Sequence, residues 1–195
     1  MRYLHQSNRG LPGARNRGLA ETRSEFVVFL DADDRLLPGA ISAGLARLVD
    51  KPEAAFTSGD HRYIDIDGRV VQEWSRPFPS ADHYQALLRG NYIGMGATVM
   101  FRRAVVEQVG GFDPSLAACE DYDLYLRISR SHPVDTHQAL VAEYRRHSNN
   151  MSADPGLMLR LTLTVLKRQE PFANAPEQRA ALEAGIRYWE DFYGR

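Results

Sequence analysis

A short apolar stretch that ends in three carboxylates constrains the fold of this chain more than any other feature. Residues 25–30 read Glu-Phe-Val-Val-Phe-Leu, and Asp31-Ala32-Asp33-Asp34 follows directly. A continuous apolar run of this length is typical of a strand buried on both faces of a sheet. Open α/β sheets bind ligands at the carboxyl ends of such strands. The stretch therefore predicts a buried strand with a polar site at its end.

The rest of the sequence alternates predicted strands with predicted helices. Strand patterns occur at 54–57, 97–101 and 140–144 and in a hairpin at 63–71, and helical patterns occur near 38–49, 81–88, 103–109, 120–131, 155–169 and 176–193. This alternation predicts an α/β fold whose mostly parallel sheet is flanked by helices. We expect a single domain over 1–195, with a catalytic core in 1–150 and helices in 151–195.

Composition and charge exclude several classes of protein. The formal net charge of −1 gives no electrostatic basis for binding nucleic acid. Cys119 is the only cysteine, which excludes a disulfide framework. No stretch approaches the roughly 20 apolar residues that a transmembrane helix needs. We expect a cytoplasmic protein, with peripheral contact at the inner membrane face left open.

The carboxylates after the apolar run suit a metal site. Asp31 and Asp33 point to the same side of an extended chain. Two carboxylates so placed form a hard oxygen site for Mg²⁺ or Mn²⁺, with coordination positions left for phosphate oxygens. The alternative is a loop whose carboxylate caps the helix that Pro38 opens. The preceding apolar strand favours the metal site.

A second acidic cluster, Glu120-Asp121-Tyr122-Asp123, begins a predicted helix. Acidic residues in a first turn are favoured by the helix dipole without any catalytic role. Three carboxylates there repel one another, however, and the dipole needs only one. One of them is a candidate general base for an attacking hydroxyl, and an ordinary Asp with a pKa of about 3.9 is ionised at neutral pH.

Other candidates are weaker when taken alone. The Gly-rich stretch 8–18 allows close backbone approach, and Arg15 suits bidentate pairing with a phosphate, although a surface turn explains the stretch as well. His147 alone is more often a structural histidine than a ligand. Trp74 and Tyr92 suit stacking on a sugar, but packing is the better explanation for each.

Together, the order of these motifs resembles the family 2 glycosyltransferases with the A-type fold. The resemblance spans about the first 150 residues and is carried by Asn8-Arg9-Gly10…Ala14-Arg15-Asn16-Arg17-Gly18, Phe29-Leu30-Asp31-Ala32-Asp33-Asp34, Gly110-Gly111-Phe112-Asp113, Glu120-Asp121-Tyr122-Asp123-Leu124…Arg127 and Tyr144-Arg145…His147. Five motifs in sequence order are hard to obtain by chance.

The resemblance implies a donor side and its metal. Asp31 and Asp33 match the family's Asp-x-Asp motif, which holds a nucleoside-diphosphate sugar and its Mn²⁺ or Mg²⁺. Arg15, Asn16 and Asp34 match positions on the same donor side. His147, a third expected metal ligand, matches a position that often approaches the metal or the diphosphate.

The resemblance also implies an acceptor side. Asp121 matches the aspartate that deprotonates an acceptor hydroxyl, so that transfer inverts the anomeric carbon. Glu120 is expected to position the acceptor, a sugar or glycan. The loop 91–96, with Gly94 and Met95, matches a flexible loop near donor and acceptor. The implied product is a polysaccharide or glycan.

The sequence departs from the family's pattern at its start. Family members begin with a β-α-β unit that grips the nucleoside, and this chain starts after the corresponding point. We therefore expect an N-terminally truncated fold with an apolar strand edge at residues 26–30, which favours a homodimer. Two other hypotheses stay open: an inactive remnant that acts as a scaffold or a weak sugar-nucleotide binder, and a nucleotidyltransferase that releases pyrophosphate.

Overall fold

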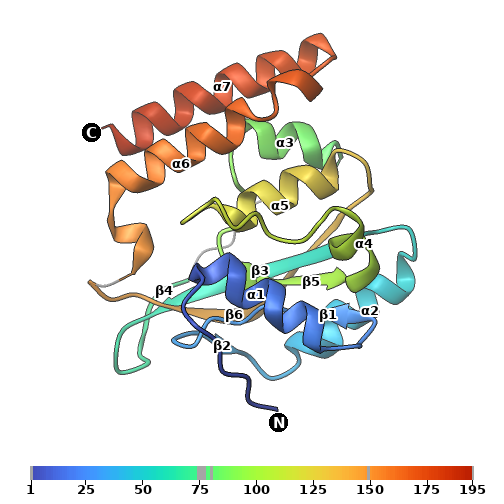
Figure 1. The fold of residues 1–195 in the computed structure, drawn as a ribbon, viewed down its shortest axis with the longest axis vertical. Coiled ribbons are helices and arrows are strands. Elements are labelled where there is room, and N and C mark those ends of the chain that lie inside the picture. Colours follow the sequence, from blue (N-terminus) through green and yellow to red (C-terminus); the bar gives the residue numbers. More distant parts are fainter. Residues whose placement is uncertain (1, 74–77, 80, 149, 195) are drawn as a thin grey trace.

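A mixed six-stranded sheet lies at the centre of the molecule, which a computed structural model describes over residues 2–73, 78–79, 81–148 and 150–194 (Figure 1). The strand order is β1-β5-β3-β6-β2, and β4 pairs with β3 off this path. The strands are β1 (Phe26–Val27), β2 (Arg35–Leu36), β3 (Phe56–Ile64), β4 (Val70–Glu73), β5 (Val99–Arg102) and β6 (Asp135–Arg145).

Helices cover both faces of this sheet. They are α1 (Gly10–Glu21), α2 (Ala40–Asp50), α3 (His83–Arg89), α4 (Arg103–Gln108), α5 (Glu120–Ser129), α6 (Pro155–Lys167) and α7 (Pro176–Tyr193), with short 3₁₀ turns η1 (Gly96–Thr98), η2 (Met151–Ala153) and η3 (Glu170–Phe172). Side chains alternate across β5, so Met100 packs with Leu48 of α2 whereas Phe101 packs with Tyr125 of α5. Beyond α5, helices α3, α6 and α7 form an outer layer (Figure 1).

The predicted α/β class with flanking helices is confirmed, but the strand directions differ from the prediction. Only the β3–β6 pair is parallel among the described strands, whereas the β1–β5, β2–β6, β3–β4 and β3–β5 pairs are antiparallel. Alternating strands and helices give a parallel sheet only when each helix carries the chain back across it. Here the predicted hairpin accounts for the β3–β4 pair, while β5 lies between β1 and β3 and runs opposite to both of them, and β2 runs opposite to β6 at the other edge.

The apolar run at residues 26–30 lies at an edge of the sheet, as expected, but it is half-buried instead of fully buried. Phe26 and Val28 pack with the cluster of Leu48 and Met100 on one face, and Val27 and Phe29 pack against the main core on the other. Only Phe26–Val27 joins the ladder, through β5 alone, and Leu30 is 46% exposed. Phe29 packs edge-on against Phe101 and Phe112 on its inner side. A groove of about 490 Å³ lies between the run and α1.

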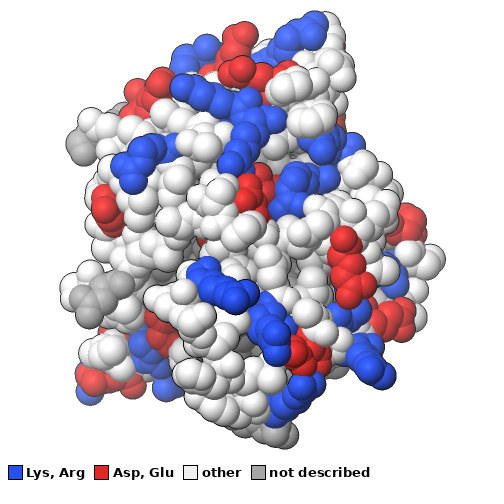
Figure 2. All heavy atoms as spheres, viewed as in Figure 1, with Lys and Arg blue, Asp and Glu red and all other residues white. Residues whose placement is uncertain are grey.

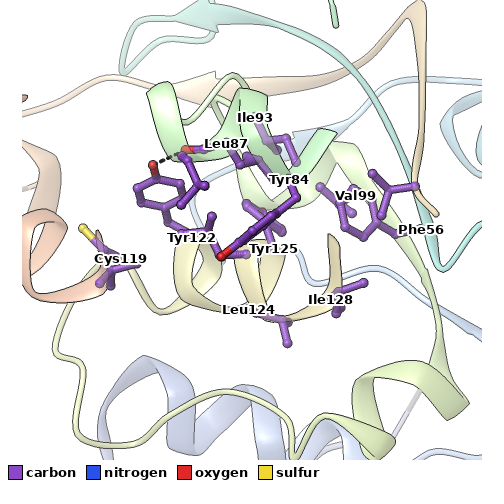
Figure 3. Close-up of a cluster of buried hydrophobic side chains, with 14 of the residues drawn as sticks. Phe56, Tyr84, Leu87, Ile93, Val99, Cys119, Tyr122, Leu124, Tyr125 and Ile128 are labelled. Atoms are coloured by element: carbon purple, nitrogen blue, oxygen red, sulfur yellow. Dashed lines mark hydrogen bonds between the residues drawn. The ribbon is translucent and has the colours of Figure 1, made fainter. Parts of the chain in front are cut away.

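Helix α5 forms the centre of the main core (Figure 3). Leu124 and Ile128, on its inner face, are fully buried. The Tyr122 hydroxyl donates a hydrogen bond to the Leu87 carbonyl of α3, so the polar end of this buried ring is satisfied (Figure 3). This packing holds the acidic first turn of α5 in a fixed place.

Helix α7 lies directly against α3 because a glycine stands at their contact. A Cβ atom on Gly185 would lie 1.9 Å from the Leu88 carbonyl oxygen, so only glycine permits this approach. Two residues after Leu88, where α3 ends, the ring of Tyr188 passes Gly90, and a Cβ atom added there would sit 3.7 Å from that ring. The last two turns of α7 are thereby fixed relative to α3 and α5.

Candidate active site

One cavity of about 620 Å³ brings the two predicted acidic clusters together. Its lining includes Asp31 and Asp33 from the turn after β1, Glu120 and Asp121 from the first turn of α5, and His147 from the segment after β6. The loop before η1 adds Gly94 and Met95. Residues that are far apart in sequence therefore face a common space, as the motif order predicts.

The turn that carries the first cluster is held by the end of β6. The Asp34 carboxylate accepts a hydrogen bond from the Arg145 backbone N–H at 2.8 Å, and the Arg145 guanidinium donates to the Asp33 carbonyl at 2.8 Å. Burial raises the pKa of Asp34 to about 6. In this structure Asp34 therefore fixes the turn, whereas Asp33 presents its carboxylate to the cavity.

Asp33 and His147 form the pair most suited to a metal. The His147 Nε2 atom lies 3.0 Å from the Asp33 Oδ2 atom, and both side chains keep partial exposure. Within the described residues, no group of three or more His, Cys, Asp or Glu side chains is arranged to hold a metal ion. The carboxylate of Asp31, the third expected ligand, turns toward Arg15 instead.

Arg15 joins the two acidic clusters. Its guanidinium donates to Glu120 Oε1 at 2.6 Å and to both carboxylate oxygens of Asp31 at 2.9 and 3.1 Å. The side chain is only 8% exposed and lies over the ring of Phe112. The sequence predicts a phosphate partner for Arg15, and the structure shows that two carboxylates occupy its planar fork.

The carboxylates of the second cluster share a poorly solvated site. Burial, and then the charge of Asp121, raise the pKa of Glu120 to about 7, while Arg15 opposes this shift. Burial likewise raises the pKa of Asp121, against the opposing effects of Arg15 and of the Tyr122 backbone N–H, which donates to Asp121 at 2.7 Å. The pair therefore takes up protons more readily than free carboxylates do, unlike the ordinary Asp that the sequence suggested.

Asp123, the remaining acidic residue of that turn, has a structural role. It accepts a hydrogen bond from Arg127 at 2.7 Å, and Arg127 also donates to the carbonyls of Val109 and Gly111. The Gly110-Gly111 motif is thus fastened to α5.

Asn16 lies on the other side of the same loop. Its side chain makes two hydrogen bonds with the backbone of Phe112, at 2.7 and 2.9 Å. The structure therefore places Asn16 outside the cavity lining, unlike the other predicted donor-side residues.

The sequence analysis missed the aromatic wall of the cavity. Four aromatic side chains from the last two turns of α7 line it: Tyr188, Trp189, Phe192 and Tyr193. Of the two aromatic residues considered earlier, Trp74 lies outside the described residues. Tyr92 packs against His83, with 2.8 Å between its hydroxyl and His83 Nδ1. The i, i+1, i+4, i+5 spacing of aromatic residues in the final helix is the signal that marks this wall.

Across the described residues, none of the helices combines the length and the apolar character that crossing a bilayer requires.

Comparison with known proteins identifies the family. The family model described as "Glycosyl transferase family 2" matches residues 1–110. The O-antigen biosynthesis protein RfbC of Myxococcus xanthus is 31% identical over 158 residues, which are 80% of this chain and 12% of that protein. The chondroitin synthase of Escherichia coli is 24% identical over 153 residues, 78% of this chain and 22% of that protein. The first three curated relatives are covered over 12–41% of their length.

Solved structures show the same fold. TarS residues 1–349 of S. aureus, in complex with UDP-GlcNAc, aligns with a TM-score of 0.68 at 16% identity, over 97% of this chain and 55% of that chain. The mannosyltransferase PcManGT of Pyrobaculum calidifontis, in complex with GDP-Man and Mn²⁺, aligns with a TM-score of 0.65 at 20% identity, over 94% and 50%. With the shared cavity and the motif order, these matches show that the chain belongs to glycosyl transferase family 2 and has the A-type glycosyltransferase fold.

Proposed function

We propose that this chain provides the catalytic part of a metal-dependent, inverting glycosyltransferase that acts in polysaccharide or glycan synthesis. It would move a sugar from a nucleoside-diphosphate sugar to an acceptor hydroxyl. The observation that carries the proposal is the single cavity shared by the Asp33–His147 pair and the Glu120–Asp121 pair. One pair suits the diphosphate of the donor, and the other suits the proton of the acceptor.

The donor set of the first pair fits a divalent cation. A carboxylate is a ligand for Mg²⁺ or Mn²⁺, and the imidazole nitrogen of His147 favours Mn²⁺, because Mg²⁺ prefers oxygen ligands. Asp33 and His147 would hold the cation, while Asp31 lines the site from its salt bridge with Arg15. A bound cation would supply positive charge to the diphosphate that leaves.

The second pair suits general base catalysis. Asp121 would accept the proton of the acceptor hydroxyl while the acceptor oxygen forms its bond to the anomeric carbon. The bond between that carbon and the diphosphate oxygen breaks from the opposite side, so the configuration inverts. Glu120 accepts a hydrogen bond from Arg15 at 2.6 Å and would orient the acceptor next to Asp121.

The ligands and processes named for similar proteins support a nucleoside-diphosphate sugar as the donor. The TarS structure contains UDP-GlcNAc, and the mannosyltransferase structure contains GDP-Man with Mn²⁺. O-antigen biosynthesis and chondroitin synthesis are the processes named for two relatives. A nucleoside-diphosphate sugar is therefore the donor class that we propose, with a sugar or glycan as acceptor.

The test is a thermal-shift titration with UDP, GDP and dTDP, each with and without Mn²⁺, on the wild type and on Asp33→Asn. A Mn²⁺-dependent rise in Tm with one nucleotide, abolished by the substitution, is expected. Release of that nucleoside diphosphate from its sugar conjugates then identifies the donor. No nucleotide-dependent shift and no release would refute the proposal, and would favour the inactive remnant.

A further inference from the structure

The outer wall of the cavity is built almost entirely from aromatic rings. On α7, Trp189 and Tyr193 stack with ring centroids 5.4 Å apart, and Tyr188 and Phe192 stack with centroids 5.9 Å apart. Tyr188 is 49% exposed and Phe192 is 58% exposed, although both belong to one connected aromatic cluster. Exposed rings grouped on the wall of a cavity are a binding feature rather than part of the core.

This wall continues directly to the second acidic pair. The ring of Trp189 lies 6.4 Å from the ring of Tyr122, centroid to centroid, and Tyr122 follows Asp121 in the first turn of α5. All of these residues line the same cavity. A ligand that rests on the α7 rings therefore reaches toward Asp121, the candidate base.

The wall is also preorganised. Gly185 lets α7 contact the backbone of α3 directly, and Tyr122 anchors α5 to the same helix through the Leu87 carbonyl. Both the wall and the base are therefore held by α3. A ligand would meet rings already in place, so little ordering opposes its binding.

The chemistry of the wall fits a saccharide ring. The faces of aromatic rings carry negative partial charge, which attracts the weakly positive C–H groups on one face of a pyranose. The hydroxyls of Tyr188 and Tyr193 offer hydrogen bonds at the ring edges. A few polar groups on a largely apolar wall, within a cavity of about 620 Å³, are typical of a small-ligand site.

The charge around the wall argues against a lipid surface as the ligand. Acidic residues alternate with basic ones along α7, as in the Glu183–Arg187 pair, and Glu190 and Asp191 lie beside the wall. Figure 2 shows the two signs interspersed over the part of the surface where α6 and α7 lie. An anionic membrane attracts a cluster of one positive sign, which this face does not present.

We propose that the aromatic wall of α7, centred on Tyr188 and Phe192, is the subsite that binds a sugar ring of the acceptor, and that the acceptor is a glycan. The inference rests on the proposed function, because it assigns the acceptor side of the same reaction. The wall lies in the C-terminal helix, beyond residues 1–110 to which the family model matches.

The probe is an oligosaccharide array that displays neutral and acidic glycans, incubated with the full chain, Mn²⁺ and UDP, GDP or dTDP. We expect binding to at least one glycan. The Tyr188→Leu/Phe192→Leu variant keeps apolar volume but removes the two exposed ring faces, and should weaken that binding about tenfold or more. The matched control is Phe172→Leu, which removes an exposed aromatic ring outside the cavity and should leave binding unchanged.

Fluorescence gives a second readout of the same site. The chain has two tryptophans, so Trp74→Phe leaves Trp189 as the only indole. A glycan found on the array should change the emission of Trp189, whereas phosphatidylcholine vesicles containing phosphatidylglycerol should not. Tm values of all variants, without ligand, confirm that they fold.

Absence of glycan binding, equal binding by the double leucine variant, or binding to the vesicles alone would overturn the inference. The Mn²⁺-dependent Tm shift with nucleotide is recorded for the same samples and reports on the proposed function separately. A shift without glycan binding would sustain the proposed function and reject the glycan subsite. Glycan binding that depends on the two rings, without any nucleotide shift or release of nucleoside diphosphate, would support a saccharide site and reject the transferase.

Discussion

The Nε2 atom of His147 lies 3.0 Å from the Oδ2 atom of Asp33, across 114 positions of sequence. Arg145 makes this pairing possible, because its backbone and its guanidinium both hold the turn that carries Asp33. The Tyr144-Arg145…His147 motif therefore has two roles. Arg145 places the turn, and His147 completes the pair that faces the cavity.

This pair predicts a selective effect on metal affinity. His147→Asn removes a nitrogen ligand while Asp33 remains, so the affinity for Mn²⁺ should fall by about tenfold or more and that for Mg²⁺ should fall less. Calorimetric titration of each metal, in the presence of the stabilising nucleotide, measures both. Asp67→Asn is the control, because Asp67 is an exposed carboxylate in the β3–β4 turn. Equal losses for the two metals would argue against His147 as a ligand.

Replacement of the proposed base should separate chemistry from donor binding. In Asp121→Asn the amide cannot accept the acceptor's proton, so kcat should fall by about 10²–10⁴-fold. The nucleotide-dependent rise in Tm should persist, because Asp33 and His147 remain. Release of nucleoside diphosphate under saturating donor measures the first effect. Wild-type turnover in Asp121→Asn would require another base.

The pH dependence of turnover follows from the environment of the same carboxyls. A base must be ionised, and burial raises the pKa of Asp121, while Glu120 beside it has a pKa of about 7. Turnover should therefore decline as pH falls from neutral, at higher pH than an ordinary aspartate with a pKa of about 3.9 would allow. The kcat profile measures this decline. Turnover that stays constant down to about pH 5 would contradict it.

Arg15 should matter for stability as well as for the site. Lysine cannot reproduce the planar fork that serves the buried Glu120 and the partly exposed Asp31, so Arg15→Lys weakens the pairing of both carboxylates, Glu120 included. We expect the free energy of unfolding to fall by about 3 kcal/mol, as measured by urea denaturation. The control on the same helix is Arg17→Met, whose exposed pair with Glu21 is worth at most about 0.5 kcal/mol. Similar losses in both variants would show that Arg15 has no special role.

The pKa of Asp135 is shifted in the opposite direction to that of Asp121, and this shift gives a prediction about stability. It accepts hydrogen bonds from Arg47, Lys51 and Thr57, and despite desolvation these partners lower its pKa. Its contribution to stability is therefore complete above the unfolded-state pKa of about 3.9 and is lost as pH falls through the folded-state value. Asp135→Asn should reduce the free energy of unfolding by about 1.5–3 kcal/mol at pH 7.

The same difference should shrink as the pH falls below about 4, because the carboxyl is then protonated in the unfolded state while it stays ionised in the folded state, so that unfolding takes up a proton. Urea denaturation at several pH values measures it, with the exposed Asp50→Asn as control. A difference that is unchanged at low pH would mean that the carboxylate charge is not what stabilises this contact.

The elements that the sequence predicts well are those with local signals. The hairpin turns at Asp67-Gly68, where Gly68 has φ of +86°, and the acidic first turn of α5 begins at Glu120 as expected. Helices α6 and α7 also follow their apolar spacing. In each case neighbouring residues determine the backbone, so a single sequence is enough.

The predictions that failed concern the number and the kind of partners. The apolar run beginning at Phe26 has the composition of a fully buried strand, but it pairs with β5 alone and stays half-buried, although its side chains pack on both faces of the sheet. Apolar composition does not reveal how completely a run is covered. Arg15 is suited equally to a phosphate and to two carboxylates, and only the tertiary structure brings Asp31 and Glu120 to it. The aromatic wall was missed because its rings resemble core residues until the cavity beside them is seen.

The close contact at Gly185 separates two properties of the site. Main-chain atoms of Leu88 set the distance from α7 to α3, so substitutions among the exposed rings of α7 leave the helix where it is. Single substitutions at Tyr188 or Phe192 would then change which acceptor binds, while the distance from α7 to Asp121 stays the same. A bulkier residue at Gly185 would instead displace the whole wall. This position therefore tolerates no larger side chain, whereas the exposed positions of the wall tolerate substitution.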